Sequence, residues 1–255
     1  MRHPEGQTAL RARGFTESVI RMMTRIAREH GAINLAQGFP DFPAPDVLKK
    51  AACAAIEADI NQYAITWGTK RLREALAARY RHRYGMDVDA DAHVTVTCGA
   101  TEAMASIALA LINPGDEVIV FEPFYENYGP DAVLAAAKPS FVTLAPPTFR
   151  IEDAPLRAAI TDRTRAIILN TPNNPTGRVF DAQEMEVVRA LAIEHDLLVI
   201  TDEIYEYILY EGEHVPFATL AGMADRTITV SGLSKTFAVT GWRIGTVVAP
   251  PALTD

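Results

Sequence analysis

From residue 93 onward, short apolar runs alternate with helical patterns, and this alternation restricts the fold more than any other feature of the sequence. Apolar strands that alternate with helices are typical of a largely parallel sheet covered on both faces. Helical patterns separate most of the runs, notably Glu102–Ile112, Tyr125–Ala137 and Ala182–Glu194. We therefore expect an α/β fold with a seven-stranded, mostly parallel, doubly wound sheet. Its strands are expected at Val94–Cys98, Glu117–Phe121, Ser140–Leu144, Arg165–Asn170, Leu197–Thr201, Thr227–Val230 and Arg243–Val248.

The residues before about position 90 lack this alternation and are expected to form helices and loops. Helical periodicity covers Glu17–Glu29, Pro45–Ala58 and Lys70–Tyr84. An irregular Gly- and Pro-rich stretch lies between the first two of these, at residues 38–43. We expect an N-terminal arm and helix over residues 1–45. This helical segment precedes one large domain over residues 46–255.

Charge and apolar patterning exclude several classes of partner. The formal net charge of −8 argues against nucleic acid. No apolar run reaches the length of a membrane span, and the N-terminus lacks the core of a secretion signal, so we expect a cytoplasmic protein and no membrane partner. Cys53 and Cys98 show no metal-ligand spacing and are too few for a disulfide framework. We expect both to be buried free thiols, and no metal site.

Unusual residues follow five of the expected strands, at the ends where a doubly wound sheet binds its ligand. Because the carboxyl ends of parallel strands share one edge, these loops should converge. This convergence is stronger support for a ligand site than any single motif. The loops are Gly99-Ala100-Thr101, Pro123-Phe124-Tyr125, Asn173-Asn174-Pro175-Thr176-Gly177, Asp202 with Tyr205, and Ser231 to Lys235.

Three charged residues near this edge predict one cofactor. Lys235 lies in a loop of small residues, Asp202 ends an apolar run upstream, and Arg243 follows eight positions after the lysine. Pyridoxal 5'-phosphate needs these three groups: an amine for its aldehyde as a Schiff base, a carboxylate for its ring nitrogen and a cation for its phosphate. We therefore expect pyridoxal phosphate at this edge.

Each further residue also has a simpler interpretation. Gly99-Ala100-Thr101 opens a helix whose N–H groups suit a phosphate, or Thr101 only caps that helix. Asp202 alone is better explained as the N-cap of a short helix at Glu203–Ile208. Ser231 and Ser234 offer hydroxyls to a phosphate, or are hydrated loop residues. Tyr125 and Tyr205 could instead be aromatic residues of the core, and Asn174 and Gly38 could be ordinary turn residues. Among the candidates, Tyr63 has the weakest support from its neighbouring sequence.

Taken together, these residues resemble a class I (fold-type I) pyridoxal phosphate-dependent aminotransferase from about Asn34 to Gly245. The most specific segments are NNPTG at 173–177, TDEIY at 201–205 and SGLSKTFAVTGWRIG at 231–245. INLAQGFPDFPAP at 33–45, with NQY at 61–63, resembles the subgroup of methionine, glutamine and kynurenine aminotransferases. The resemblance implies amino acid and 2-oxo acid substrates, and a large domain that binds the cofactor.

The resemblance also implies a role for each matching residue. Lys235 forms the Schiff base and shuttles the proton, and Asp202 binds the ring nitrogen. Asn174 and Tyr205 bind the ring oxygen, and Tyr125 stacks on the ring. The phosphate is held by Gly99, Ala100, Thr101, a serine near the lysine and Arg243. Tyr63 reaches the phosphate of a partner subunit, which implies a homodimer with shared active sites. Gly38 and Asn174 contact the substrate, and the Glu122–Pro123 and Asn174–Pro175 bonds are expected to be cis.

The sequence departs from the family pattern twice. Many relatives have a phosphate-binding serine where this chain has Gly232, so Ser234 or Ser231 must substitute, and we favour Ser234. Family members also continue into a C-terminal small domain that supplies an arginine for the substrate carboxylate. The chain stops at Asp255, so we expect that domain and its clamp to be absent.

Three alternatives to an aminotransferase stay open. A carbon–sulfur β-lyase or an aminocyclopropane-carboxylate synthase would use the same lysine and aspartate. A truncated, non-catalytic cofactor-binding or dimerisation module would bind pyridoxal phosphate without turnover. A nicotinamide-binding protein has the least support of the three, because no GxGxxG motif follows a strand.

Overall fold

The structure, a computed structural model, describes residues 9–254. They fall into two units that divide between Pro43 and Ala44. Residues 1–8, part of the expected N-terminal arm, lie outside the described residues. Within the described part, no helix is both long and apolar enough to span a membrane.

The described residues of the first unit, 9–43, contain one α-helix. A short 3-10 helix (η2, Leu10–Ala12) precedes α1 (Val19–Glu29), and an irregular stretch follows it. Ser18 caps α1 by accepting a hydrogen bond from the N–H of Arg21 at 3.2 Å. None of the α1 residues is buried. Gly38 lies in the irregular stretch, as the sequence indicated.

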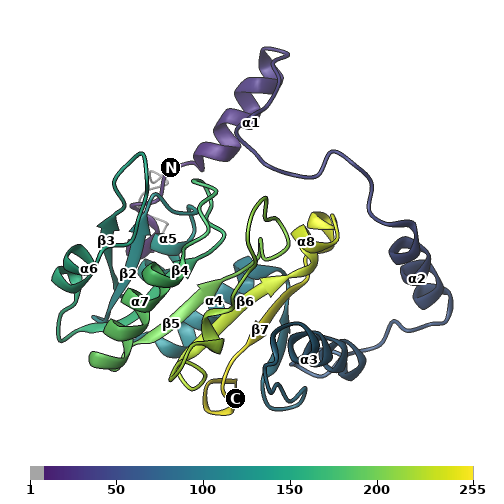
Figure 1. Cartoon of the computed structure of the whole chain (residues 1–255). Coiled ribbons are helices and arrows are strands. Elements are labelled where there is room, and N and C mark those ends of the chain that lie inside the picture. The colour runs from purple at the N-terminus through teal and green to yellow at the C-terminus, as the bar shows by residue number, and fades with distance from the viewer. Residues whose placement is uncertain (1–8, 255) are drawn as a thin grey trace. The chain divides into compact units, whose positions relative to one another are not determined.

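The second unit is built on the expected seven-stranded sheet, of which β2 to β7 are labelled in Figure 1. The strand order is β1-β7-β6-β5-β4-β2-β3. All neighbours from β6 to β3 are parallel, whereas β7 runs antiparallel to both β1 and β6. The predicted α/β class and mostly parallel sheet are confirmed. The strands are β1 (Val94–Thr97), β2 (Glu117–Glu122), β3 (Lys138–Thr143), β4 (Thr164–Asn170), β5 (Leu198–Asp202), β6 (Thr227–Gly232) and β7 (Gly245–Val248).

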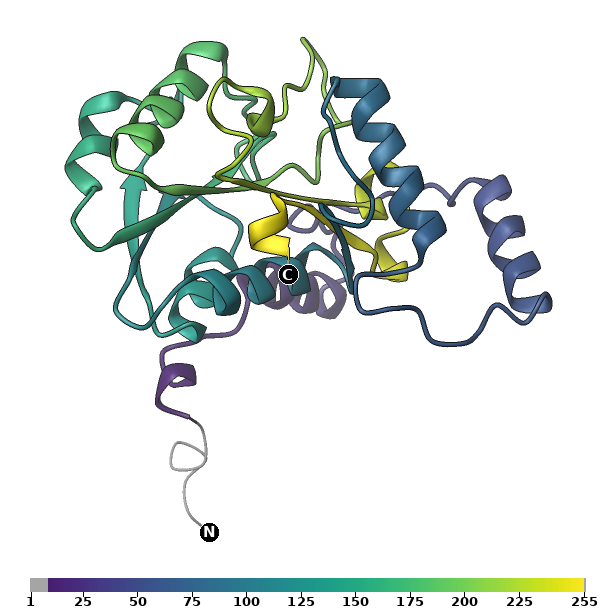
Figure 2. The same ribbon diagram turned by 90° about the horizontal axis from the view of Figure 1, so that it is seen from below.

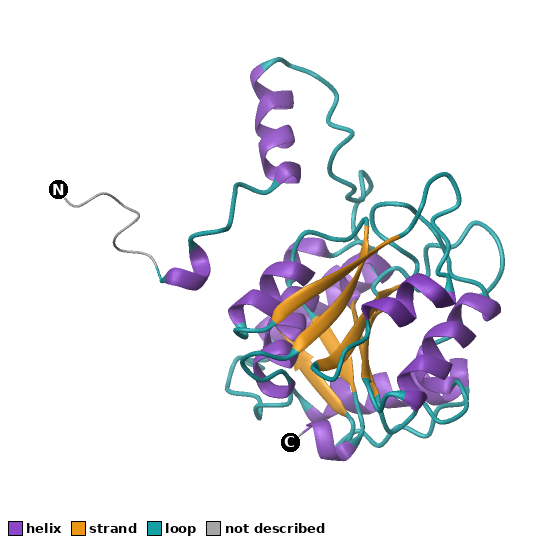
Figure 3. Ribbon diagram, turned by 90° about the vertical axis from the view of Figure 1, so that its left-hand side faces the viewer, coloured by secondary structure: helices purple, strands orange, loops and turns teal. Residues whose placement is uncertain are grey.

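Helices cover both faces of this sheet. The helices of this unit are α2 (Asp46–Glu57), α3 (Lys70–Tyr84), α4 (Ala100–Leu111), α5 (Tyr128–Leu134), α6 (Asp153–Ala159), α7 (Ala182–Glu194), α8 (Leu233–Thr236) and α9 (Pro251–Thr254), with 3-10 turns η3 (Phe217–Thr219) and η4 (Thr240–Trp242). Figure 2 shows α4 and α5 on one side of the strands and α6 and α7 on the other, and Figure 3 shows the strands enclosed between them.

Alternate residues of the central strands face opposite helix layers, which explains why their sequences are apolar throughout. Val118 and Val120 of β2 pack into the α4–α5 core, while Ile119 and Phe121 pack into the α6–α7 core. Fully burying a side chain such as Ile119 stabilises the fold by roughly 2 kcal/mol. The sheet is therefore a rigid platform between two apolar layers.

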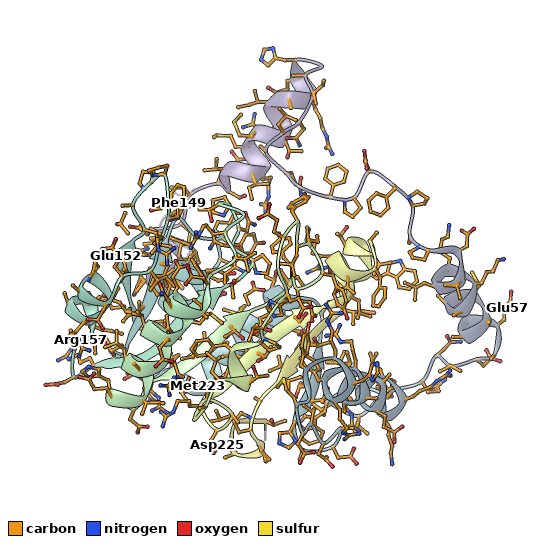
Figure 4. All side chains as sticks on the ribbon, viewed as in Figure 1. Glu57, Phe149, Glu152, Arg157, Met223 and Asp225 are labelled. Carbon is orange, nitrogen blue, oxygen red and sulfur yellow. The ribbon has the colours of Figure 1, made fainter. Side chains whose placement is uncertain are left out.

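Polar contacts fix the outer helices. α7 begins with a capping box in which Asp181 accepts from the N–H groups of Gln183 and Glu184. Arg157 of α6, labelled in Figure 4, forms an ion pair with Glu194 at the end of α7 at 2.7 Å. Exposed pairs of this kind contribute about 0–1 kcal/mol, so packing holds these helices.

Both cysteines contradict the expectation of burial. Cys53 and Cys98 are free thiols, but both are exposed. Cys53 lies on α2, none of whose residues is buried, and Cys98 lies in the loop after β1. Cysteine is often buried because it packs as a small apolar group, and that tendency was the only support for the expectation.

Candidate active site

The carboxyl ends of β4, β5 and β6 lie side by side, and the loops that follow them meet at one edge of the sheet. Asn170 of β4 pairs with Asp202 of β5, which pairs with Val230 of β6. The Asn170 amide donates to the carbonyls of Asp202 at 2.8 Å and Pro172 at 3.1 Å, which joins two of these loops. Sequence reasoning missed Asn170. Its signal is an amide at the end of an apolar strand, where a buried polar group needs partners.

Lys235 lies in α8, the short helix that follows β6. Its side chain is partly buried, and its Nζ atom lies 5.8 Å from the centroid of the Tyr205 ring. Burial, and the nearby positive charge of Arg243, lower the pKa of Lys235 below its usual value. An amine that loses its proton easily is suited to attack a carbonyl or to accept a proton.

Asp202 is a buried carboxylate at the end of β5, with 5% of its surface exposed. The hydroxyl of Tyr128 donates to its Oδ2 atom at 2.6 Å, and the N–H of Ile204 donates to Oδ1 at 3.2 Å. Burial raises the pKa of Asp202, and the Tyr128 hydrogen bond lowers it. Residues 204–207 form turns and none of the residues 203–208 is helical, so the expected short helix there is wrong and Asp202 is not a helix cap.

Sequence reasoning also missed Tyr128 as a site residue. It is 2% exposed, and its ring packs edge-on against Tyr125, with centroids 5.9 Å apart. Burial, followed by the charge of Asp202, raises the pKa of Tyr128 well above its usual value, so its hydroxyl keeps its proton and acts as a donor. The available signal was a second tyrosine three positions after Tyr125, because such spacing places two side chains on one helical face.

Tyr205, Asn174 and Tyr125 surround the space between Asp202 and the lysine. Burial, and then the charges of Asp202 and Tyr125, raise the pKa of Tyr205 to about 12, while an interaction with the Asn174 amide lowers it. The N–H of Asn174 donates to the side chain of Asn170 at 2.8 Å. Partly buried phenols and an amide at this edge are suited to bind a ring oxygen.

Two of the cis peptide bonds are those that the resemblance implied. Glu122–Pro123, just before Tyr125, and Asn174–Pro175 are both cis, which confirms the prediction. The bonds Pro146–Pro147 and Thr171–Pro172 are also cis, and the sequence gave no indication of either.

The loop after β1 forms an anion cradle at the start of α4. Gly99 is the N-cap residue and provides no side-chain cap, so the α4 N–H groups are available. Gly99 has φ 85°, and a Cβ atom there would overlap the Arg243 guanidinium, so glycine is required. Thr101 lies inside α4, so the interpretation of Thr101 as the cap is wrong. Arg243, the α4 amides and Thr101 therefore share one location.

The two candidate serines have different surroundings. Ser231 is fully buried, and its hydroxyl donates to Glu206 Oε1 at 2.8 Å. Ser234 lies next to Lys235 and is 7% exposed. A Cβ atom at Gly232 would come within 2.7 Å of the Ile244 carbonyl oxygen, so a larger residue at this position would require the backbone to shift. The geometry therefore favours Ser234 as the free hydroxyl.

The structure does not bring Tyr63 into this constellation. Its side chain is 104% exposed, in the loop between α2 and α3. Gly38 belongs to the first unit, whereas the sheet belongs to the second. The roles of Tyr63 and Gly38 stay predictions.

A cavity of about 850 Å³ opens beside Asn174 and Tyr205. Its walls come from the segments 171–186 and 205–220, which follow β4 and β5. Apolar side chains such as Phe180 and Met185 line it. Ligand sites are typically concave and apolar with a few directed polar groups, and this edge has both properties.

Comparisons with known proteins point to one family. Residues 30–255 match the family model described as aminotransferase class I and II. The chain is 43% identical over 249 residues to a probable N-succinyldiaminopimelate aminotransferase, DapC, of Mycobacterium tuberculosis; this match covers 96% of the chain and 63% of the relative. Human kynurenine–oxoglutarate transaminase 1 is 40% identical over 240 residues, with 89% and 57% covered.

Solved structures agree with the sequence matches. N-succinyldiaminopimelate aminotransferase from Mycobacterium tuberculosis has a TM-score of 0.93 at 43% identity, covering 96% of the chain and 65% of that structure. YbdL from Escherichia coli, whose structure is described with a methionine aminotransferase function, has a TM-score of 0.89 at 37% identity, with 93% and 63% covered. The chain thus spans about three fifths of the length of these relatives.

Proposed function

The chain belongs to the family of class I and II aminotransferases, as its motifs predicted, and from this premise we propose that it moves an amino group from an amino acid to a 2-oxo acid. The family uses pyridoxal phosphate. We propose that the second unit is the domain that binds it. The observation that carries the proposal is the meeting of a partly buried Lys235, a buried Asp202 and Arg243 at one edge of the sheet.

The donors and acceptors at this edge fit pyridoxal phosphate. The uncapped start of α4 and Arg243 suit a phosphate dianion. Among the described residues, no Lys, Arg or His forms an ion pair with Asp202, so its carboxylate can accept a hydrogen bond from a protonated ring nitrogen. Asn174 and Tyr205 would bind the ring oxygen, and Tyr125 would stack on the ring.

When bound, pyridoxal phosphate supplies a ring that accepts electrons from the substrate α-carbon. The chain supplies the rest. Lys235 would bind the aldehyde until the substrate amine displaced it. It would then accept the proton from the substrate α-carbon and donate it to the carbon that had carried the aldehyde, because its lowered pKa makes the neutral amine accessible. Asp202, oriented by Tyr128, would keep the ring nitrogen protonated. Ser234 is our choice for the phosphate-binding serine, since the Ser231 hydroxyl is bonded to Glu206.

The assembly we propose is a homodimer with shared active sites. The complete exposure of Tyr63 supports it, because a tyrosine that binds a partner's phosphate must project from its own subunit. Sedimentation should give twice the chain mass, and Tyr63→Phe should weaken pyridoxal phosphate binding without changing the unfolding free energy. A monomer that binds the cofactor as tightly as the parent would exclude shared sites. The cytoplasmic location stays a prediction.

One experiment tests the proposed function against its rivals. Purified protein is mixed with pyridoxal phosphate, and the visible absorption band of the lysine adduct is followed as amino acids are added. We expect the band to appear and then to be lost with one or more donors, with exchange into a 2-oxo acid. First donors are those that the relatives' names suggest: succinylated diaminopimelate, kynurenine and methionine. Pyruvate release from cysteine conjugates without exchange would identify a lyase, and a band without turnover would identify a binding module.

A further inference from the structure

A second buried carboxylate, Glu206, follows Asp202 by four residues and has no part in the chemistry proposed above. It is 1% exposed, and three side chains donate to it. Arg79 Nη2 at 3.0 Å and the Ser231 hydroxyl at 2.8 Å donate to Oε1, and the Tyr84 hydroxyl at 2.5 Å donates to Oε2. Arg79 and Tyr84 belong to α3, whereas Ser231 belongs to β6. One carboxylate thus joins three segments that are distant in sequence.

Two of these segments carry groups of the candidate site. Glu206 is the residue after Tyr205, and Ser231 lies at the end of the strand that leads through Gly232 to Lys235. The Tyr205 ring and the Lys235 amine face each other at 5.8 Å. The hydrogen bond between Glu206 and Ser231 therefore links the segment that carries Tyr205 to the segment that carries Lys235.

We propose that Glu206 is a positioning residue for the Lys235 site: its carboxylate fixes the separation of Tyr205 and Lys235 and so keeps water away from the lysine amine. The inference rests on the proposed function only where it treats Lys235 as the reactive amine. The hydrogen bonds themselves do not depend on any bound group.

Two arginines of α3, Arg79 and Arg83, face the Glu206 carboxylate. Among the described residues, Arg79 is its only ion-pair partner. The neighbouring buried acid, Glu203, has its own partners: His214 Nε2 at 2.7 Å and the N–H of Phe217 at 3.1 Å. The further titratable groups that face Glu206 are Tyr80 and Arg83 of α3, and Tyr207 faces the two arginines from the same loop as Glu206. Lys235 itself faces Arg243 and Tyr205.

Three variants separate positioning from charge. Glu206→Asp keeps the charge but is too short to reach both α3 and β6. Glu206→Gln keeps the length but loses the charge and one acceptor. Glu117→Gln is the matched control, because Glu117 is also a largely buried acid bonded by a cation, Lys138 at 2.9 Å, and a hydroxyl, Thr161 at 2.7 Å. It lies at the start of β2, at the edge of the sheet opposite Lys235.

The readout is the protonation of Lys235 in protein without cofactor. Trinitrobenzenesulfonate reacts with free amines, and peptide mass spectrometry gives the labelling rate of each lysine as a function of pH. Lys70, on the exposed side of α3, is the internal reference. In the parent, burial and the charge of Arg243 lower the pKa of Lys235, so its labelling midpoint should lie below the usual value for a lysine.

Positioning predicts that Glu206→Asp raises the Lys235 midpoint by about 0.5–1 pH unit, because water that reaches the amine stabilises its charged form. Glu206→Gln keeps one oxygen that can accept from Ser231, so it should raise the midpoint by less. Glu117→Gln should leave the midpoint unchanged. A direct effect of charge predicts a fall with Gln and no change with Asp, which would overturn the proposal. Lower stability with an unchanged midpoint in both variants would also overturn it, since Glu206 would then be structural only.

Ser231→Ala is the milder variant if the Glu206 variants do not fold. It removes only the link between the Tyr205 and Lys235 segments, and it should reproduce most of the shift. Combined with Glu206→Asp, it should add little further, because both changes break the same bond. Additive shifts, or a Ser231→Ala midpoint equal to that of the parent, would contradict the proposal. If wild-type protein fails to bind pyridoxal phosphate, the proposed function fails, and this test of Glu206 still stands.

Discussion

The two carboxylates that follow β5 differ in how their charge is balanced. Glu206 is surrounded by Arg79, Tyr84 and Ser231, so its partners are all supplied by the chain. Asp202 has one hydroxyl and one N–H, and no ion-pair partner among the described residues. A buried carboxylate without a cation is costly. The difference indicates that Glu206 completes the scaffold, and it supports the role that we propose for Asp202 as the partner of a positively charged ligand.

The largest expected contrast is in folding stability. Glu206→Ala leaves Arg79 buried without its partner and should lower the unfolding free energy by about 3 kcal/mol. Asp202→Ala removes a carboxylate that is poorly solvated and should change the same quantity by no more than about 1 kcal/mol. Urea unfolding of the cofactor-free protein at pH 7 measures both. Equal losses in the two variants would break the comparison.

Cofactor affinity should show the reverse order. Asp202→Asn removes the charge that we expect to hold the ring nitrogen and should weaken pyridoxal phosphate binding by about 2–3 kcal/mol, roughly 30- to 150-fold. Titration of the absorption band gives the dissociation constant. Asp131→Asn is the control, because Asp131 is buried in α5 outside the proposed site. Equal affinity for the Asp202→Asn variant and the parent would remove Asp202 from the proposed role.

Asp131 also tests whether an unbalanced carboxylate by itself destabilises this fold. Its Oδ2 atom is buried without a hydrogen-bond partner among the described residues, and burial raises its pKa to about 6. The folded chain keeps this proton at pH values where the unfolded chain has lost it. Stability therefore falls as pH rises from about 4 to about 6. Asp131→Asn should be more stable than the parent by about 1 kcal/mol at pH 7, with a smaller difference at pH 4. Thermal melts at both pH values check this, and an equal gain at both would contradict it.

The smallest effect concerns the hydroxyl that orients Asp202. Tyr128→Phe removes a hydrogen bond that lowers the Asp202 pKa, so this pKa should rise further. A carboxyl with a raised pKa loses stability as pH rises through the range between its unfolded and folded values. The variant should therefore lose about 0.5–1 kcal/mol more than the parent between pH 4 and pH 7. Urea unfolding at the two pH values provides the test, and parallel losses in both proteins would show that Tyr128 has no influence on Asp202.

Much of the fold could be predicted because burial dictates the sequence of its central elements. β2, β4, β5 and β6 face helices on both sides, and their apolar runs were assigned within one or two residues at each end. The bounds of α3 and α7 were predicted to the residue. α6 was missed, because its seven residues contain a proline and are too few to show a helical period.

The site could be predicted only where residues stand next to the strand ends. Lys235 and Asp202 were found in this way, because topology brings the carboxyl ends of β5 and β6 together. Tyr128 and Glu206 were not, since their importance depends on hydrogen bonds to residues 74 and up to 127 positions away. The hydrogen bond of Ser231 could not be predicted either, because its partner Glu206 comes from another loop.

The central claim is that Lys235 is the amine that binds pyridoxal phosphate. The most direct test is to mix the protein with the cofactor, reduce with borohydride and locate the modified peptide by mass spectrometry. The account predicts a pyridoxyl group on the peptide that contains Lys235, and none on Lys235→Ala. A modification on another lysine that persists in Lys235→Ala would contradict it.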